Sequence, residues 1–344
     1  GEENVIVGHK AGDALTDADF NVAVGRSSLT SDTLGSKTTA VGHGTLNTQN
    51  YTTATDSFNV AVGYNAGAAV TTGTLNTFIG GLAGDAITTA AADIAIGHQS
   101  LSSDTLGSHS VGIGFQALTN QNFTTATDVY NVAVGSFAGR LTTTGVQNTL
   151  VGGLAGDALT DADFNTAVGY NALTADTLGS RSTAIGRSAL QAQNFTTATD
   201  VYNVGVGYAA GAAVTTGVQN TLIGGLAGDA LTTANNNVAI GYQAHSTDDL
   251  GSRNISIGSE ALSDMNFATA TDSYNVAVGD QAGKRITTGI QNTLIGALAG
   301  DALSDADSNV AIGTNALASD TLGSQSVAIG RQALFTQNFT TATN

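Results

Sequence analysis

The pentapeptide "NVAVG" at residues 59–63 recurs unchanged at residues 131–135, and close variants fill the chain, such as "NTLIG" at 220–224 and "SVAIG" at 326–330. The glycine that ends the pentapeptide occurs nineteen times. From Gly63 the steps to the next four of these glycines, at positions 80, 97, 114 and 135, are 17, 17, 17 and 21, and the same order leads on to Gly207 and Gly279. The units therefore group into a 72-residue super-repeat, and Gly63, Gly135, Gly207 and Gly279 end the first four super-repeats. A fixed period of this kind indicates a repeat architecture in which each copy supplies the same structural unit.

The pentapeptide itself predicts a β-strand. The residue before the glycine is Val or Ile in every copy, and the residue two places earlier is Val, Ile or Thr. This alternation has a period of two, so the β-branched side chains share one face of a strand. We expect that face to form the core. The residue between them, most often Ala, then points outward.

A 17-residue unit cannot close a core alone, but it can do so by stacking on copies of itself. The sequence therefore predicts an all-β parallel β-solenoid of about nineteen 17- or 21-residue coils. It predicts one continuous repeat domain over residues 1–344, forming a segment of a longer fibre. Equivalent residues are expected to lie above one another, and Asn at the first position can pass hydrogen bonds from coil to coil. The columns are represented by Asn59, Val62, Gly63, Asn131, Val134, Gly135, Asn203, Val206, Gly207, Asn275, Val278 and Gly279.

Two further features of the coil follow from its columns. Three residues after the glycine comes Ala in most copies, then Leu or Gly, with His245 as the exception. We interpret this segment as a second short strand entered through a turn at the glycine. The outward Ala column, interrupted by a bulky residue once per super-repeat, predicts a surface that faces other chains, most simply around a threefold axis. The bulky residues are Phe78, Leu150, Leu222 and Leu294.

Composition excludes several partners. The chain has 10 Lys and Arg against 27 Asp and Glu, so it lacks the basic clusters that nucleic acids or anionic membranes require. It has no Cys, which excludes disulfides and thiol chemistry. No apolar run is long enough to insert into a membrane, and no cofactor motif is present; "GGLAGDA" lacks the Lys-Ser/Thr ending of a phosphate loop.

Stretches such as "NVAVGYNAG" at 59–67, "NTAVGYNAL" at 165–173 and "SVAIGRQAL" at 326–334 resemble the head repeats of trimeric autotransporter adhesins, the YadA-like head family, which also occur in phage tail fibres. The resemblance covers essentially the whole chain. It implies a left-handed parallel β-roll, a homotrimer and a rigid extracellular stalk or head. These 17- or 21-residue units are longer than is usual in that family.

The 21-residue units add a loop with paired aromatic residues, as in "NFTTATDVY" at 122–130. Rings on a projecting loop can stack on the sugars of a receptor glycan; alternatively, they cover the flank of the solenoid or pack between chains. The candidate contact residues are Tyr51, Phe58, Phe123, Tyr130, Phe195, Tyr202, Phe267 and Tyr274, and Phe339 begins a further loop.

Acidic residues and histidines give weaker signals. Asp13, Asp17 and Asp19 alternate in a way that can bind Ca²⁺, and they recur at Asp157, Asp161, Asp163, Asp301, Asp305 and Asp307. The equivalent units at Asp85 and Asp229 lack the pair, which favours a solvated acidic loop without a metal. No nucleophile, base and orienting group are suggested together, so we expect no enzyme. The histidines are His9, His43, His98, His109 and His245.

These observations predict an extracellular structural and adhesive fibre segment, on a bacterial surface or a virion tail fibre, that attaches to a cell-surface receptor or glycan. An adhesive role would gain strength from weak contacts repeated along the fibre. The alternatives are a self-assembling extracellular filament or matrix protein and, less favoured, an ice-binding solenoid. Ice binding is disfavoured because the Thr-rich segments come only once per super-repeat.

Overall fold

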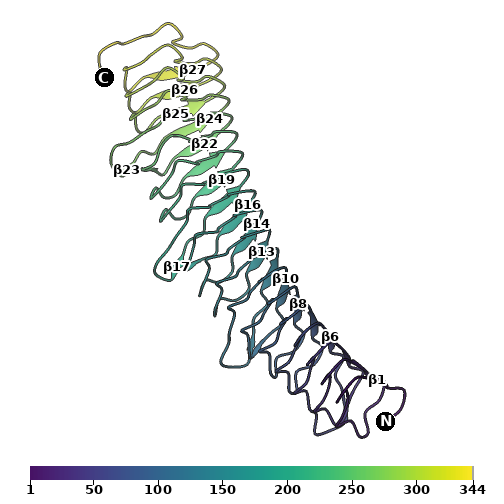
Figure 1. Cartoon of the computed structure of the whole chain (residues 1–344). Helices are drawn as coiled ribbons and strands as arrows, with labels where there is room; N and C mark the ends of the chain where they lie inside the picture. Colours follow the sequence, from purple (N-terminus) through teal and green to yellow (C-terminus); the bar gives the residue numbers. More distant parts are fainter. Residues whose placement is uncertain (343–344) are drawn as a thin grey trace. The chain divides into compact units, whose positions relative to one another are not determined.

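The computed structural model describes residues 1–342, and in that part of the chain it contains short parallel strands joined by turns and no helix. The fold is a parallel β-solenoid of about nineteen coils, as the repeat predicts. The chain divides into two compact units, Gly1–Ala167 and Val168–Asn344. Within each unit the strands of successive coils lie side by side (Figure 1).

Each pentapeptide forms one three-residue strand. In the first unit these are β1 (Val5–Val7), β2 (Val22–Val24), β4 (Thr39–Val41), β6 (Val60–Val62), β7 (Thr77–Ile79), β8 (Ile94–Ile96), β10 (Val111–Ile113), β12 (Val132–Val134) and β13 (Thr149–Val151), with β14 (Thr166–Val168) at the boundary. In the second unit they are β16 (Thr183–Ile185), β18 (Val204–Val206), β19 (Thr221–Ile223), β20 (Val238–Ile240), β22 (Ile255–Ile257), β24 (Val276–Val278), β25 (Thr293–Ile295), β26 (Val310–Ile312) and β27 (Val327–Ile329).

The pairing register confirms the stacking of equivalent residues. In 17-residue coils Val5 pairs with Val22, and in a 21-residue coil Thr39 pairs with Val60. The four extra residues therefore leave the strand column undisturbed. Each 21-residue coil also has a two-residue strand that pairs with one in the preceding 17-residue coil, which the sequence did not reveal. The pairs are β3 (Gly35–Ser36) with β5 (Thr55–Asp56), β9 (Gly107–Ser108) with β11 (Thr127–Asp128), β15 (Gly179–Ser180) with β17 (Thr199–Asp200), and β21 (Gly251–Ser252) with β23 (Thr271–Asp272).

The two faces of the strand are opposite to those predicted. In β12, Ala133 is fully buried, whereas Val132 and Val134 are partly exposed. The prediction that Val and Ile form the core and Ala the outer face is wrong, because the opposite wall of the coil lies too close. A Cβ added to Gly112, at the same position as Ala133, would lie 2.5 Å from Ser100 Oγ. Only small side chains fit there in most coils.

Bulky residues enter this column once per super-repeat, where glycines make room for them. A Cβ on Gly211 would lie 2.6 Å from Leu222 Cδ1, and one on Gly228 would lie 2.7 Å from Leu222 Cδ2. In most other coils the facing position carries Leu and the strand carries Ala or Gly; the exception in the fourth super-repeat is His245 with Ser256. Phe78, Leu150, Leu222 and Leu294 are thus buried core residues, and the prediction that they interrupt an outer face is wrong.

The Asn column forms a buried ladder. The backbone N–H of Asn76 donates to Oδ1 of Asn59 in the preceding coil (2.9 Å), and Nδ2 of Asn59 donates to the carbonyl of Gly73 (2.8 Å). Each side chain therefore satisfies one backbone donor and one backbone acceptor inside the coil, where no water reaches them. Asn131, Asn203 and Asn275 make the same contacts.

The segment after the invariant glycine is a tight turn and not the predicted second strand. Gln116 and Leu118 have φ angles of 54° and 50°, in the left-handed region, and the N–H of Ala117 donates to the carbonyl of Gly114 (3.4 Å). Two left-handed residues in three positions are incompatible with an extended strand. Leu118 points inward and is fully buried, so the turn still supplies a core residue.

A second buried polar contact holds the 21-residue coils. Asp104 accepts the Nε2 proton of Gln121 and the backbone N–H of Gly107 (3.0 Å). Gln121 also donates to Ser110 Oγ (2.9 Å) and accepts from Asn131 Nδ2 (2.9 Å). The same Asp–Gln pair occurs as Asp32–Gln49, Asp176–Gln193 and Asp320–Gln337.

In the fourth super-repeat this contact is made by different residues. Met265 occupies the position of the glutamine, and Nε2 of His245 lies 3.0 Å from Oδ2 of Asp248. Both side chains are fully buried. Asn254 replaces the Ser or Thr that usually accepts from the glutamine, and it accepts the Ser273 hydroxyl instead (2.8 Å). Three positions have changed together, and the buried carboxylate keeps a partner.

Candidate ligand-contact sites

Each 21-residue coil places a basic residue, an aspartate and an aromatic ring together on the surface. Pairing of β3 with β5 brings Ser36 opposite Asp56, so the next residue, Lys37, lies beside Asp56 and Phe58. Lys37 Nζ donates to Asp56 Oδ2 (2.6 Å) and lies 5.2 Å from the centre of the Phe58 ring. We call this group of three residues the basic–acidic–aromatic cluster.

The cluster recurs once in each of the next three super-repeats. The His109 ring lies 3.2 Å from Asp128 Oδ1 and stacks on Tyr130, with centroids 5.1 Å apart. The guanidinium of each remaining cluster pairs with its aspartate and covers its tyrosine ring in the same way. These clusters are Arg181–Asp200–Tyr202 (2.8 Å and 5.9 Å) and Arg253–Asp272–Tyr274 (3.0 Å and 5.7 Å).

One side of each ring in these clusters is covered by the basic side chain, while about half of the aromatic residue remains accessible. The exposed fractions are 49% for Phe58, 51% for Tyr130 and 50% for both Tyr202 and Tyr274. The ion pairs are exposed, so they contribute little to stability. Held this way, an aromatic face lies next to charged hydrogen-bonding groups, an arrangement suited to a polyhydroxylated ligand.

The other four predicted contact residues are placed differently. Tyr51, Phe123, Phe195 and Phe267 are almost completely buried beneath the loop. The hydroxyl of Tyr51 donates to the carbonyl of Gly73 (2.6 Å), and burial raises the pKa of this phenol well above its usual value. The predicted pairs are therefore split. The first ring of each pair packs on the solenoid, and the second ring is accessible.

A second set of exposed aromatic residues follows the invariant glycine directly. Tyr64 stacks on His43 (5.4 Å), Phe115 stacks on His98 (5.7 Å), and Arg187 lies 5.7 Å from the Tyr208 ring. These contacts join neighbouring coils along the surface. The sequence marks them only as a variable column, since Tyr, Phe, His, Arg and Ser all occupy it.

The acidic loops bond to the neighbouring coil. Oδ1 of Asp163 accepts the backbone N–H of Val146 (2.7 Å), and Oδ1 of Asp161 accepts the Thr144 hydroxyl (2.6 Å). Asp157 lies 3.2 Å from Arg140, and burial nevertheless raises the pKa of its carboxyl. Among residues 1–342 no three His, Cys, Asp or Glu side chains converge as a metal site would require. That part of the chain also has no helix able to span a membrane.

The only His–carboxylate pair in the core of the described chain, His245 with Asp248, is sealed from solvent on all sides. A substrate has no route to it, so its role is structural. His9, by contrast, lies in an exposed turn.

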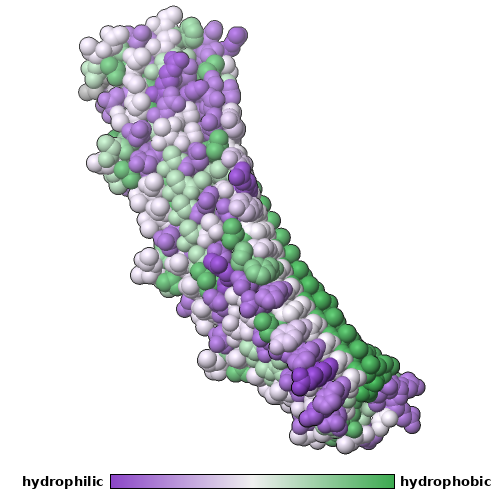
Figure 2. Space-filling view, in the orientation of Figure 1, coloured by the Kyte–Doolittle hydropathy of each residue, from purple (hydrophilic) through white to green (hydrophobic). Residues whose placement is uncertain are grey.

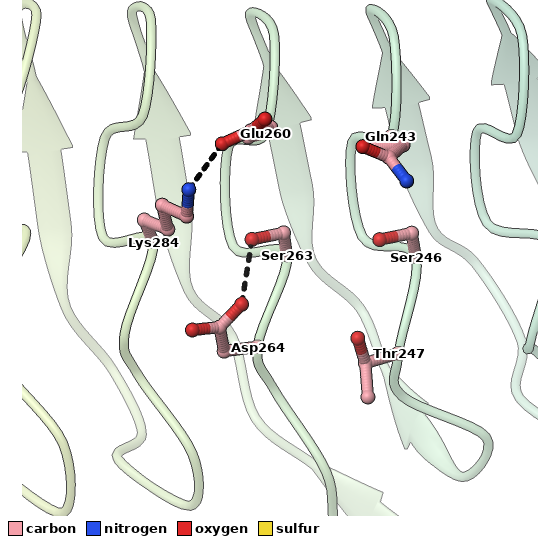
Figure 3. A pocket seen from close by; sticks show the side chains of 7 residues that line it. All are labelled: Gln243, Ser246, Thr247, Glu260, Ser263, Asp264 and Lys284. Carbon is pink, nitrogen blue, oxygen red and sulfur yellow. Dashed lines mark hydrogen bonds and ion pairs between the residues drawn. The ribbon is translucent and has the colours of Figure 1, made fainter.

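A polar hollow of about 210 Å³ lies beside the fourth super-repeat and is lined by Gln243, Ser246, Thr247, Glu260, Ser263, Asp264 and Lys284 (Figure 3). It is smaller than most ligand pockets. Its charged groups already have partners: Lys284 and Gln281 both donate to Glu260, and Ser263 donates to Asp264. The hollow is therefore a weaker candidate than the exposed clusters.

Comparison of the chain with models of protein families and with curated protein sequences finds no match.

Proposed function

We propose that this chain is a structural and adhesive segment of an extracellular fibre, which self-associates as a homotrimer and presents repeated contacts to a cell-surface receptor or glycan. The observation that carries the proposal is the outward Val/Ile stripe, defined as the first and third residues of strands β1 to β27 at the pentapeptides. The trimeric state and the bacterial-surface or virion location follow from the resemblance to YadA-like head repeats and remain predictions.

The stripe carries Val or Ile at every third strand position and Val, Ile or Thr at every first position, so it is mainly apolar in every coil. Even with β-branched neighbours in the adjacent coils, several of its residues are 36% to 40% exposed: Val62, Ile79, Ile185 and Ile295. Figure 2 shows the stripe as a band of hydrophobic residues along the strands of the first unit. Apolar surfaces of this extent are rarely left to water. A second copy of the chain carries a matching flat stripe with the same spacing, which makes self-association its simplest cover.

The mass of the protein in solution tests self-association. We expect three times the 34.2 kDa of one chain by light scattering. Replacement of Val62 and Ile79 by Lys places two charges in the stripe and should shift the mass towards the monomer. Leu75→Lys is a matched control, because Leu75 is 58% exposed but lies outside the strands. A monomer at micromolar concentration would contradict the proposal, and a broad distribution of larger masses would favour a self-assembling filament.

Adhesion is assigned to the exposed rings of the four clusters. Each contact is weak alone, and several copies on one chain act together through avidity. Replacing Phe58, Tyr130, Tyr202 and Tyr274 by Ala should lower binding to a glycan array or to cells by more than tenfold while the trimer mass stays unchanged. The control replaces Tyr64, Tyr170, Tyr208 and Tyr242, which are as exposed but lie outside the clusters. Equal binding by both variants would remove the clusters from adhesion.

A further inference from the structure

The loop of the 21-residue coil carries the tripeptide Asn-x-Thr in the same place in several super-repeats. It reads Asn50-Tyr51-Thr52, Asn122-Phe123-Thr124 and Asn194-Phe195-Thr196, and again Asn338-Phe339-Thr340. Asn-x-Ser/Thr with x other than Pro is the acceptor sequence for N-linked glycosylation, which requires an accessible loop. The tripeptide alone is common, and only a tripeptide that the fold exposes can be modified.

The structure presents the asparagine and the threonine on the same, solvent-facing side. Asn122 and Thr124 are exposed, while Phe123 between them is buried. The buried ring anchors the loop, and the backbone N–H of Asn122 donates to the carbonyl of Thr143 (3.0 Å). In an extended segment residues two apart share a face, so an enzyme can contact the threonine hydroxyl and the reacting amide together.

The amide of the asparagine is also oriented. The hydroxyl of Thr105 in the preceding coil donates to Oδ1 of Asn122 (3.1 Å), so the amide is held through its oxygen and not through Nδ2. The same contact orients the other asparagines: Thr33 to Asn50 (3.0 Å), Thr177 to Asn194 (3.1 Å) and Thr321 to Asn338 (3.3 Å). Within residues 1–342, Nδ2 of Asn122 makes no hydrogen bond that would have to be broken.

From this geometry we propose that Asn50, Asn122, Asn194 and Asn338 are acceptor sites for N-linked sugar. In the reaction Nδ2 attacks the anomeric carbon of a nucleotide- or lipid-linked sugar phosphate. The new C–N bond forms as the bond to the phosphate oxygen breaks, the phosphate leaves with the electron pair, and the amide loses one proton. No oxidant or reductant is needed. The proposal is independent of adhesion and of trimer formation.

The chain contains two internal controls. Asn266-Phe267-Ala268 occupies the same loop in the fourth super-repeat, with an exposed Asn266, but it lacks the hydroxyl at the third position. Asp249 also stands where Thr105 stands in the second super-repeat. Conversely, Asn254-Ile255-Ser256 has the complete tripeptide, but its Asn254 is fully buried. Asn266 thus tests an exposed asparagine that lacks the hydroxyl residue, and Asn254 tests a complete tripeptide whose asparagine is buried.

The test incubates the folded full chain with a soluble N-glycosyltransferase and UDP-glucose, and locates the added hexose by intact mass and peptide mapping. We expect one hexose at each of the four asparagines and none at Asn254 or Asn266. Thr124→Ala should abolish modification at Asn122 alone, and Ala268→Thr combined with Asp249→Thr should add a fifth site at Asn266. The urea-unfolded chain should in addition be modified at Asn254.

The proposal is overturned if the folded chain gains no hexose where the unfolded chain gains it at the same asparagines. Modification of Asn254 in the folded chain to the same extent as Asn122 would equally refute the role of the loop geometry. Peptide mapping of the protein isolated from the cells that make it is the second measurement. Sugar at these asparagines is expected, and unmodified peptides at all four overturn the assignment.

Discussion

The coils that hold Asp104 and Asp248 differ in how they stabilise an equivalent buried carboxylate. Asp104 receives a neutral amide from Gln121 in the following coil, whereas Asp248 receives the imidazole of His245 from its own turn. The backbone contact is the same in both, since Gly107 donates to Asp104 (3.0 Å) and Gly251 to Asp248 (3.1 Å). The buried carboxylate thus has a side-chain partner in both coils, either from the glutamine position of the following coil or from the turn of its own coil.

The two solutions differ electrostatically. Burial raises the pKa of Asp104, and the hydrogen bonds from Gln121 and from backbone N–H groups do not compensate for it. Burial also acts to raise the pKa of Asp248, but the hydrogen bond and the charge of His245, with the N–H groups of Phe267 and Leu250, outweigh it and lower the pKa. The stabilising effect of Asp104 is therefore present at low pH and lost as pH rises through its folded pKa. That of Asp248 is present at higher pH and lost as pH falls through its folded pKa.

The largest effect is expected for His245→Leu. This change restores the usual core leucine but leaves Asp248 without a side-chain partner, and breaking a buried charged pair costs roughly 3–5 kcal/mol. Hydrogen–deuterium exchange of peptides covering residues 241–270 measures the loss locally. Adding Met265→Gln and Asn254→Ser should restore most of the stability, because Asp248 then has the partners of Asp104. Additive losses in the combined variant would show that the three positions are not coupled.

A comparable effect, confined to high pH, is expected at Asp93, which occupies the ladder position held by Asn237 in the fourth super-repeat. Burial raises the pKa of Asp93 to about 8, and its Oδ2 has no partner. Because the folded pKa is above the unfolded one, stability falls as pH rises from about 4 through about 8. Asp93→Asn should remove this dependence and gain several kcal/mol at pH 9, because each pKa unit corresponds to about 1.4 kcal/mol. Urea unfolding between pH 5 and pH 9 measures it, with Asn237→Asp as the converse variant; parallel profiles for Asp93→Asn and the wild type would contradict the assignment.

Next comes Gln121→Met, which introduces the residue of the fourth super-repeat into the second. Asp104 and Asn131 each lose a hydrogen bond, at a cost of about 1–2 kcal/mol. The cost is below that of His245→Leu because Asp104 keeps its hydrogen bonds from the backbone N–H groups of Gly107 and Phe123 and loses a neutral partner, not an imidazole. Adding Leu101→His should recover part of the loss and lower the pKa of Asp104, measured by carboxyl NMR titration. No recovery would mean that the turn of this coil cannot orient an imidazole.

The smallest effect is expected on the surface. Arg253→Gln removes the ion pair with Asp272 and should cost less than about 1 kcal/mol, with most of that cost absent at high salt. Thermal unfolding at low and high salt measures it. A loss as large as that of His245→Leu would show that the clusters contribute to the stability of the coil.

Much of the fold could be predicted because the coils stack, so that residues one sequence period apart lie next to each other. The glycine spacing gave the coils, and Val5 pairs with Val22 as that spacing requires. Alternation shows which residues share a face, but not which face is inside. The coil is narrow, so the small side chain of Ala133 is buried inside it, and Val134, which was expected in the core, faces outward. The second strand was predicted wrongly because Gln116 and Leu118, which carry no glycine signal, adopt left-handed conformations.

The sequence predicted only part of the candidate site. Aromatic pairs marked the loops, but nothing in the pairs distinguished the buried Phe123 from the exposed Tyr130. The basic residues of the clusters could have been identified from the sequence. Lys37, His109, Arg181 and Arg253 recur once per super-repeat in a chain with few basic residues, and the aspartates Asp56, Asp128, Asp200 and Asp272 recur with the same period. Their contact depends on the short strands β3 and β5 and their equivalents, which the sequence did not suggest.

The column of invariant glycines limits how such a chain can change its length. A Cβ on Gly63 would lie 2.4 Å from the carbonyl oxygen of Gly80, and equivalent glycines are similarly close. A deletion or insertion inside a pentapeptide would put a side chain into this column and prevent the coils from closing, whereas the four extra residues of the 21-residue coils lie in a loop and leave the column intact. Duplication or loss of one whole super-repeat keeps every neighbour relation, including the surface clusters. Genes for such chains should therefore grow and shrink by recombination between super-repeats, so that natural variants differ in length by multiples of this unit.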